Sequence, residues 1–120
     1  MTKEGYTSNE RIKEESDFLR GNISDLLHDG SITHFPSEEE FLLKFHGITQ
    51  QDNRDERLIR KKNGQERNWL FMLRLRLPGG RMTPSQWLAA ETLSDQFGNG
   101  SLKLTTRQAN QIHGVVKQDL

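Results

Sequence analysis

Long polar side chains are concentrated in one short stretch of the chain, the run LKLTTRQANQIHG from Leu102 to Gly114. Its two ends show the alternation of a β-strand, and the polar donors are Arg107, Gln108, Asn110, Gln111 and His113. Guanidinium and amide N–H groups that a strand holds in place bind carboxylates and similar anions. The run therefore indicates a surface that holds an anionic ligand.

A second set of candidates, Arg74 and Arg76, lies in the otherwise apolar run from Trp69 to Leu77. Because successive side chains of a strand point to opposite faces, a strand here places one apolar face on a core and directs both arginines out of the other. A solvated outer face is the simpler interpretation of such a pair. Leu70 and Met72 share the face with the arginines, however, and an arginine in a half-buried setting is suited to binding an anion.

His113 could ligate a metal, transfer a proton or donate to an anion, and a single histidine on a strand is most often a structural residue. No second His, Cys or carboxylate stands at a ligand spacing from it, so the sequence predicts no metal site. Its neighbours Arg107 and Gln111 favour anion binding. Thr105 and Thr106 are typical turn residues, and a hydroxyl beside an arginine in a tight turn suits a carboxylate or phosphate equally well.

The composition indicates one modest domain, because only 32% of the 120 residues are hydrophobic and 28% are charged. Lys plus Arg equals Asp plus Glu at 17 each, so no overall field attracts nucleic acid or an anionic membrane. The chain has no Cys, which excludes an iron–sulfur cluster held by its own residues. With no apolar run suited to a membrane span or a signal peptide, a cytoplasmic protein is the default expectation.

The first half of the chain is predicted to be helical and then irregular. Apolar residues recur at mostly helical spacing over Ser8–Leu27, whose first residue is the expected N-cap, and Gly21 marks a point where the helix can divide in two. Ser37–Glu40 has the spacing of a capping box, but the helix is expected to be short because Phe41–His46 resembles a strand. The almost wholly polar Gln50–Arg67 is predicted to be a long solvated loop.

The second half predicts the order strand, helix, strand, strand. The helix begins at Pro84, since Thr83 and Gln86 complete a capping box, and it ends at Gly98. It is expected to bury Ala89, Ala90, Leu93 and Phe97, and the strands are expected at Trp69–Leu77, Ser101–Leu104 and Gln111–Val116. This order predicts an α+β protein, with an N-terminal helical arm and polar loop over residues 1–67 and an incomplete ferredoxin-like half-domain over residues 68–120. A complete unit needs a further helix and strand, so we expect the sequence to be an N-terminal fragment.

Four blocks of the chain resemble the N-terminal portion of the sulfite reductase haemoprotein family, one of the sirohaem-dependent nitrite and sulfite reductases. The blocks are Glu10–Gly21, Phe41–Arg57, Met72–Gly80 and Leu104–Gly114. Their order and spacing also match, and together they cover nearly the whole chain from Ser8 onward. Four ordered blocks are a specific signal, whereas any one of them alone is weak.

The resemblance implies a six-electron reduction of sulfite to sulfide at sirohaem coupled to a 4Fe-4S cluster, with electrons from NADPH through a flavoprotein partner or from ferredoxin. It implies that Arg74 contacts the substrate anion and the sirohaem edge. It also implies cofactor contacts at the matching positions Lys103, Thr105, Thr106, Arg107, Gln111 and His113. The cysteines that hold the cluster belong to later parts of the family's chain, so this segment alone is expected to be inactive.

Two positions depart from the family pattern: Thr106 stands where asparagine is common, and Thr49 stands where an aromatic residue is common. Two other functions stay open. One is a segment of the related sirohaem nitrite reductase, which shares the core motifs, although the blocks ERIKEESDFLRG and QQDNRDER favour the sulfite enzyme. The other is a non-catalytic half-domain that binds a partner haemoprotein or an anionic ligand through its basic strand face.

Overall fold

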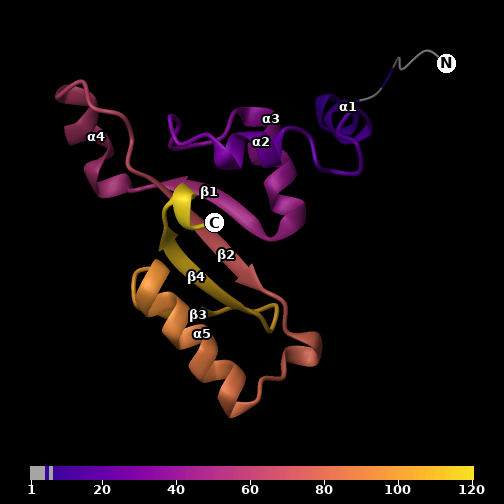
Figure 1. Cartoon of the computed structure of the whole chain (residues 1–120), viewed down its shortest axis with the longest axis vertical. Helices are drawn as coiled ribbons and strands as arrows, with labels where there is room; N and C mark the ends of the chain where they lie inside the picture. Colours follow the sequence, from indigo (N-terminus) through magenta and orange to yellow (C-terminus); the bar gives the residue numbers. More distant parts are fainter. Residues whose placement is uncertain (1–4, 6) are drawn as a thin grey trace.

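The computed structural model describes residues 5 and 7–120. These residues form helices and a four-stranded antiparallel sheet, so the predicted α+β class is confirmed (Figure 1). The strands, in the sheet order β1-β2-β4-β3, are β1 (Ile48–Asp52), β2 (Trp69–Leu75), β4 (Asn110–Val115) and β3 (Leu102–Leu104). The helices are α1 (Ser8–Glu14), α2 (Ile23–His28), α3 (Ser37–Leu43), α4 (Arg54–Lys62) and α5 (Pro84–Phe97), with 3-10 helices η1 (Lys44–His46), η2 (Pro78–Gly80) and η3 (Lys117–Asp119). Within this described part of the chain, every helix is too short or too polar to cross a membrane.

The predicted N-terminal helix is two helices, and the break between them is longer than Gly21 alone suggested. Helix α1 begins after Thr7, which is the N-cap in place of the expected Ser8, because the Thr7 hydroxyl accepts from the Glu10 N–H and the Glu10 carboxylate accepts from the Thr7 N–H. Between α1 and α2 the backbone is left-handed at three consecutive non-glycine residues, Asp17, Phe18 and Leu19. It is left-handed again at Gly21. A left-handed turn cannot continue a right-handed helix, so α1 ends at Glu14.

The strand expected at Phe41–His46 is wrong, because these residues complete α3 and form η1. Helical spacing brings Phe41 and Phe45 into an edge-to-face contact with ring centroids 5.4 Å apart, and it buries the adjacent Leu42 and Leu43 together. The capping box expected at Ser37 is also absent. Pro36 is the N-cap and has no side-chain capping hydrogen bond, and three consecutive glutamates lie in the first turn, where the helix dipole favours negative charge.

The solvated loop expected at residues 50–67 is wrong for most of its length, because it contains the end of β1 and all of α4. Helix α4 is polar because it extends away from the sheet, and side-chain pairs stabilise it, among them Arg60 with Glu56 at 3.0 Å (Figure 1). Strand β1 is polar as well, yet it pairs with β2 along its length, from Ile48 opposite Leu73 to Asp52 opposite Trp69. The division of the chain at residues 67 and 68 stays a prediction, and β1 and β2 form one sheet across it.

The predicted order strand, helix, strand, strand is confirmed for the second half of the chain as β2, α5, β3 and β4. The predicted start of α5 is confirmed too: the Thr83 hydroxyl accepts from the Gln86 N–H at 3.2 Å, and the Gln86 side chain accepts from the Thr83 N–H at 2.9 Å. Gly98 is the C-cap, as expected. The predicted buried stripe of α5 is largely wrong, because Ala90 is buried while Leu93 and Phe97 stay 45% and 43% exposed and Ala89 is exposed.

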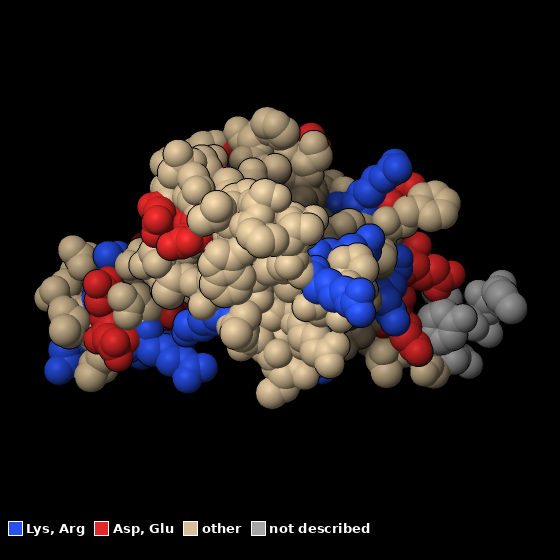
Figure 2. Space-filling view, turned by 90° about the horizontal axis from the view of Figure 1, so that it is seen from below, with Lys and Arg blue, Asp and Glu red and all other residues tan. Residues whose placement is uncertain are grey.

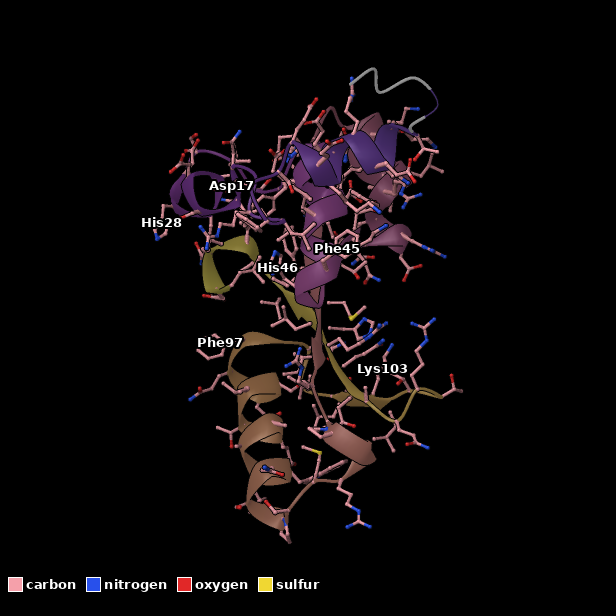
Figure 3. All side chains as sticks on the ribbon, turned by 90° about the vertical axis from the view of Figure 1, so that its right-hand side faces the viewer. Asp17, His28, Phe45, His46, Phe97 and Lys103 are labelled. Carbon is pink, nitrogen blue, oxygen red and sulfur yellow. The ribbon has the colours of Figure 1, made fainter. Side chains whose placement is uncertain are left out.

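The sheet has two unlike faces, which we name the core face and the open face. The core face carries Phe71, Leu73, Ile112 and Val115, and Phe35 and Leu43 from the N-terminal half pack on it. The open face carries the alternate residues of the same strands: Met72, Arg74, Gln111, His113 and Lys103. Figure 3 shows Phe97 of α5 and Lys103 on opposite sides of the sheet. Helices α2, α3 and α5 therefore lie on the core face, and the predicted site residues on the strands lie on the other side.

Candidate functional site

Strand register brings three of the predicted residues into one row across the open face. Arg74 of β2 pairs with Gln111 of β4, and Gln111 pairs with Lys103 of β3. Directly opposite residues in antiparallel strands have Cβ atoms about 5 Å apart, so these side chains leave the sheet next to one another. Residues distant in the sequence thus form a row in which two cations flank an amide.

His113 joins this row through a β-bulge in β4. The register shifts by one residue between Phe71 and Leu73, so that His113 and Gly114 together lie opposite Met72. Gly114 has a φ of 79°, and a Cβ there would lie 3.1 Å from the Cβ of Asn99, so glycine suits this bulge.

The imidazole of His113 is hydrogen-bonded to Gln111, with His113 Nε2 3.0 Å from Gln111 Oε1. Burial lowers the pKa of His113, and the positive charge of Lys103 lowers it further. At neutral pH the ring is therefore neutral, and its Nε2–H donates to the amide oxygen. The amide N–H groups of Gln111 are left to donate to an acceptor on the open face.

Thr105, Thr106 and Arg107 lie in the hairpin loop between β3 and β4. The loop closes when the Thr105 N–H donates to the Ala109 carbonyl at 2.9 Å, and the Thr105 hydroxyl accepts from the Ala109 N–H at 3.3 Å. Gln108 has a φ of 58°, which completes the tight turn. Thr105 is thus a turn residue whose hydroxyl can still donate, while Thr106 and Arg107 are exposed at the tip of the loop.

Arg107 and Arg74 line a hollow of about 650 Å³ at the end of the sheet, where β2 ends and the hairpin turns. Its other cations are Arg76 and Lys44, and no Asp or Glu is among the described residues that line it. In the described part of the chain, none of these four side chains has an ion pair or a side-chain hydrogen bond. Figure 2 shows one compact group of Lys and Arg side chains beside a broad uncharged surface, with further Lys and Arg side chains toward both edges of the view.

Lys44 is the residue of this hollow that sequence reasoning missed. It lies in η1, thirty residues before Arg74, and it also lines a smaller adjoining hollow of about 160 Å³ with Thr49, Met72 and Arg74. The signal that could have indicated it is the run KFHG, in which Gly47 ends η1 in the left-handed conformation. The structure thus joins Lys44, Arg74, Arg76 and Arg107 at the hollow, while Lys103, Gln111 and His113 do not line it.

The donor set suits an anion with several carboxylates and does not suit a metal ion. Guanidinium and ammonium groups without acidic partners bind carboxylates by charge-assisted hydrogen bonds. Among the described residues no cluster of His, Asp or Glu could hold a metal, and the chain has no Cys for a cluster.

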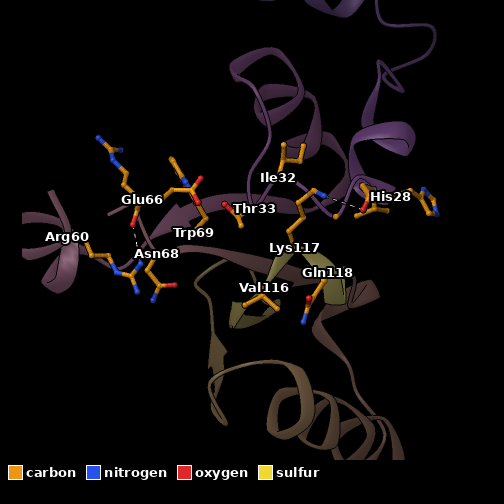
Figure 4. A pocket seen from close by; sticks show the side chains of 13 residues that line it. His28, Ile32, Thr33, Arg60, Glu66, Asn68, Trp69, Val116, Lys117 and Gln118 are labelled. Atoms are coloured by element: carbon orange, nitrogen blue, oxygen red, sulfur yellow. Dashed lines mark hydrogen bonds between the residues drawn. The ribbon is translucent and has the colours of Figure 1, made fainter. Parts of the chain in front are cut away.

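A second hollow, of about 510 Å³, lies between the N-terminal helices, the end of β4 and the start of β2 (Figure 4). Its lining mixes charges of both signs, including Arg60 and Glu66. Its most buried cation, Lys117, already donates to the carbonyls of Asp29 at 2.7 Å and Leu27 at 3.3 Å. Arg60 is paired with Glu56, and the guanidinium of Arg67 lies 5.7 Å from the centroid of the Trp69 ring. This hollow therefore has fewer unpaired cations than the first, and an acidic residue, Glu66, is in its lining.

Comparison with known proteins identifies the family. A family model described as the nitrite/sulfite reductase ferredoxin-like half domain matches residues 63–120. The beta subunit of NADPH sulfite reductase from Saccharomyces cerevisiae is 58% identical over 94% of this chain and 8% of its own length. The chain belongs to the sulfite reductase haemoprotein family.

Bacterial members of the family match over a larger share of their length. The NADPH sulfite reductase hemoprotein beta-components of Shouchella clausii and Bacillus subtilis are 46% and 47% identical, over 99% and 92% of this chain. The chain spans 21% and 19% of these two relatives. The resemblance to the sulfite reductase haemoprotein family is therefore confirmed, and the second half of the chain is its ferredoxin-like half-domain.

Proposed function

We propose that the chain forms part of an assimilatory sulfite reductase haemoprotein, which reduces sulfite to sulfide by six electrons at sirohaem coupled to a 4Fe-4S cluster. In this proposal the chain contributes contacts to sirohaem and to the substrate anion, and other parts of the protein supply the cluster ligands. The observation that carries the proposal is the hollow lined by Lys44, Arg74, Arg76 and Arg107, in which none of the described lining residues is acidic.

Sirohaem, when bound, supplies the iron at which the substrate is reduced, and its carboxylates need fixed cationic and amide donors. The chain offers donors of this kind on rigid elements. Arg74, Gln111 and Lys103 stand on three paired strands, and His113 orients the Gln111 amide. Arg107 and the Thr105 hydroxyl add donors from a closed hairpin. The sheet holds the backbones of these donors before binding, so the entropy lost on binding is confined to their side chains.

Arg74 is the proposed contact for the substrate anion. The backbone of Arg74 is held on both sides of β2. On one side its N–H donates to the Gly47 carbonyl at 2.8 Å, and on the other side Arg74 pairs with Gln111 of β4. Its side chain is exposed and lines both adjoining hollows. A guanidinium in this position stabilises an oxyanion during reduction and can supply hydrogen bonds in a fixed geometry.

Electrons are proposed to come from a partner. The relatives are named NADPH sulfite reductase, which favours a flavoprotein component over ferredoxin as the donor. Sulfide production with NADPH and the flavoprotein, compared with production from reduced ferredoxin, distinguishes the two.

The test is the substitution Arg74→Ala in the complete haemoprotein, expressed from the full reading frame. Loss of one oxyanion contact is expected to lower sulfite turnover by about 10²-fold to 10³-fold while sirohaem absorption is retained. Arg81→Ala is the control, because Arg81 is exposed and lines neither hollow. Full sulfite turnover in the Arg74 variant contradicts the proposal, and faster turnover of nitrite than of sulfite by the unaltered protein favours the nitrite enzyme.

A further inference from the structure

The N-terminal half of the chain reaches the open face at the turn that follows η1. The carbonyl of Gly47 accepts the Arg74 N–H at 2.8 Å, so this turn is attached directly to the backbone of Arg74. Gly47 has a φ of 80°, and a Cβ there would lie 3.2 Å from the Arg74 carbonyl oxygen. Glycine therefore allows both the left-handed turn and the close approach. The turn places Lys44 beside Arg74. Each of these two residues lines the large hollow of about 650 Å³ and the smaller one of about 160 Å³.

Lys44 and Arg74 line the same hollow, and no acidic residue lies beside them there in the part of the chain that the structure describes. The smaller hollow of about 160 Å³ is lined by these two cations together with Gly47, Thr49 and Met72. Within the described residues, neither cation forms an ion pair with an acid, and the Thr49 hydroxyl has no hydrogen bond to another side chain. Two like charges in one small hollow repel each other, and an anion between them removes that cost. A hydroxyl and two cationic groups are the donors that a small oxyanion requires.

We propose that Lys44 is a further anion-binding residue of this site, and that its ammonium group shares with Arg74 one small oxyanion held in the smaller hollow. The inference rests on the proposed function only for the identity of that oxyanion, which is free sulfite or a carboxylate of sirohaem. The site then belongs to both halves of the chain: η1 and β1 contribute Lys44 and Thr49, and β2 contributes Arg74. The N-terminal half is part of the binding site and not only an arm attached to it.

The first experiment measures sulfite binding to the isotope-labelled chain by NMR, with fresh sodium sulfite and with sodium chloride at matched ionic strength. We expect saturable shifts of the Gly47 and Arg74 amides with sulfite, and a dissociation constant that Lys44→Gln raises about twofold to fivefold, as for a partly solvated charge pair. Lys61→Gln is the matched control, because Lys61 is exposed on α4 and lines neither hollow.

Three results overturn free sulfite as the oxyanion at Lys44: no saturable shift in the unaltered chain, equal affinity in Lys44→Gln and the unaltered chain, or an equal loss of affinity in Lys61→Gln. None of them depends on sirohaem, so the experiment is separate from the test of the proposed function. That function fails independently if the complete protein shows no sirohaem absorption or no sulfide production.

The second experiment separates the two sources of the oxyanion, with Lys44→Gln in the complete haemoprotein. If the anion is free sulfite, KM for sulfite rises about twofold to fivefold and sirohaem content is unchanged. If the anion is a sirohaem carboxylate, sirohaem content or retention during dialysis falls and KM is unchanged. Either result supports a shared oxyanion, whereas no change in KM, sirohaem content or retention contradicts it.

Discussion

The two faces of the sheet are built from alternate residues of the same strands, and they differ in almost every other property. On the core face Phe71 is fully buried and contacts Phe35 edge to face, with ring centroids 5.8 Å apart. On the open face Arg74 is exposed and has no acidic partner among the described residues. The comparison shows that one strand can place residues that stabilise the fold on one face and residues that bind a ligand on the other. It can do so because successive side chains of a strand point to opposite faces of the sheet.

The connections between the two halves of the chain differ in the same way. On the core side, Gln50 is buried and its amide exchanges hydrogen bonds with the Phe35 backbone, at 2.6 Å and 3.2 Å. Lys117 is also buried, and its ammonium group donates to two carbonyls at the end of α2. Gln50 and Lys117 are therefore satisfied within the chain, although Trp69 Nε1 on the same side is buried without a hydrogen-bond partner among the described residues. The cations of the open face, by contrast, are available to a ligand.

The largest effect that tests this comparison is expected from Phe71→Ala, matched by Phe18→Ala. Removal of the buried ring should lower the free energy of unfolding by about 3–5 kcal/mol, since it leaves a cavity in the core. Phe18 is 88% exposed, so the same substitution there should change it by less than about 0.5 kcal/mol. Urea denaturation followed by circular dichroism measures both, and similar losses in the two variants would show that the core lies elsewhere.

An intermediate effect is expected from Lys117→Met, matched by Lys103→Met on the open face. The methionine keeps the apolar stem but leaves the carbonyls of Leu27 and Asp29 without their donor, which should cost about 1–3 kcal/mol of unfolding free energy. Lys103 is exposed, and its loss should cost less than about 0.5 kcal/mol. Thermal denaturation compares the two, and a greater loss from Lys103→Met would reverse the roles given to the two faces.

The smallest effect concerns His113, whose pKa lies below the ordinary value of 6.5 because of burial and then because of Lys103. The unfolded chain takes up this proton more readily than the folded chain, so stability falls as the pH drops from about 6.5 toward the folded-state pKa. Lys103→Gln should raise the pKa of His113 in an NMR titration of its ring protons, and Lys61→Gln should leave it unchanged. An unchanged pKa in Lys103→Gln would mean that the two side chains are not neighbours on the open face.

Local sequence signals predicted the elements that are stabilised locally. The Thr83 capping box begins α5, and the alternation from Trp69 onward marks β2, because each signal acts within a few residues. The same signals failed at Phe41–His46, where burial of Leu42 and Leu43 against the core favours helix. They also failed at β1, a polar strand whose partner β2 lies some twenty residues further along the chain. Propensity is a weak determinant when distant partners decide the pairing.

The sequence by itself determined which groups could bind an anion: arginines, a lysine, amides and a histidine, with no cysteine and no metal-ligand spacing. It also determined, through strand alternation, that Arg74 leaves β2 on the side opposite Phe71. Only the tertiary structure decided that Arg74, Gln111 and Lys103 form one row and that Lys44 joins Arg74 at the hollow. The physical reason is that register and the Gly47 contact depend on hydrogen bonds between residues far apart in the sequence, which no local pattern encodes.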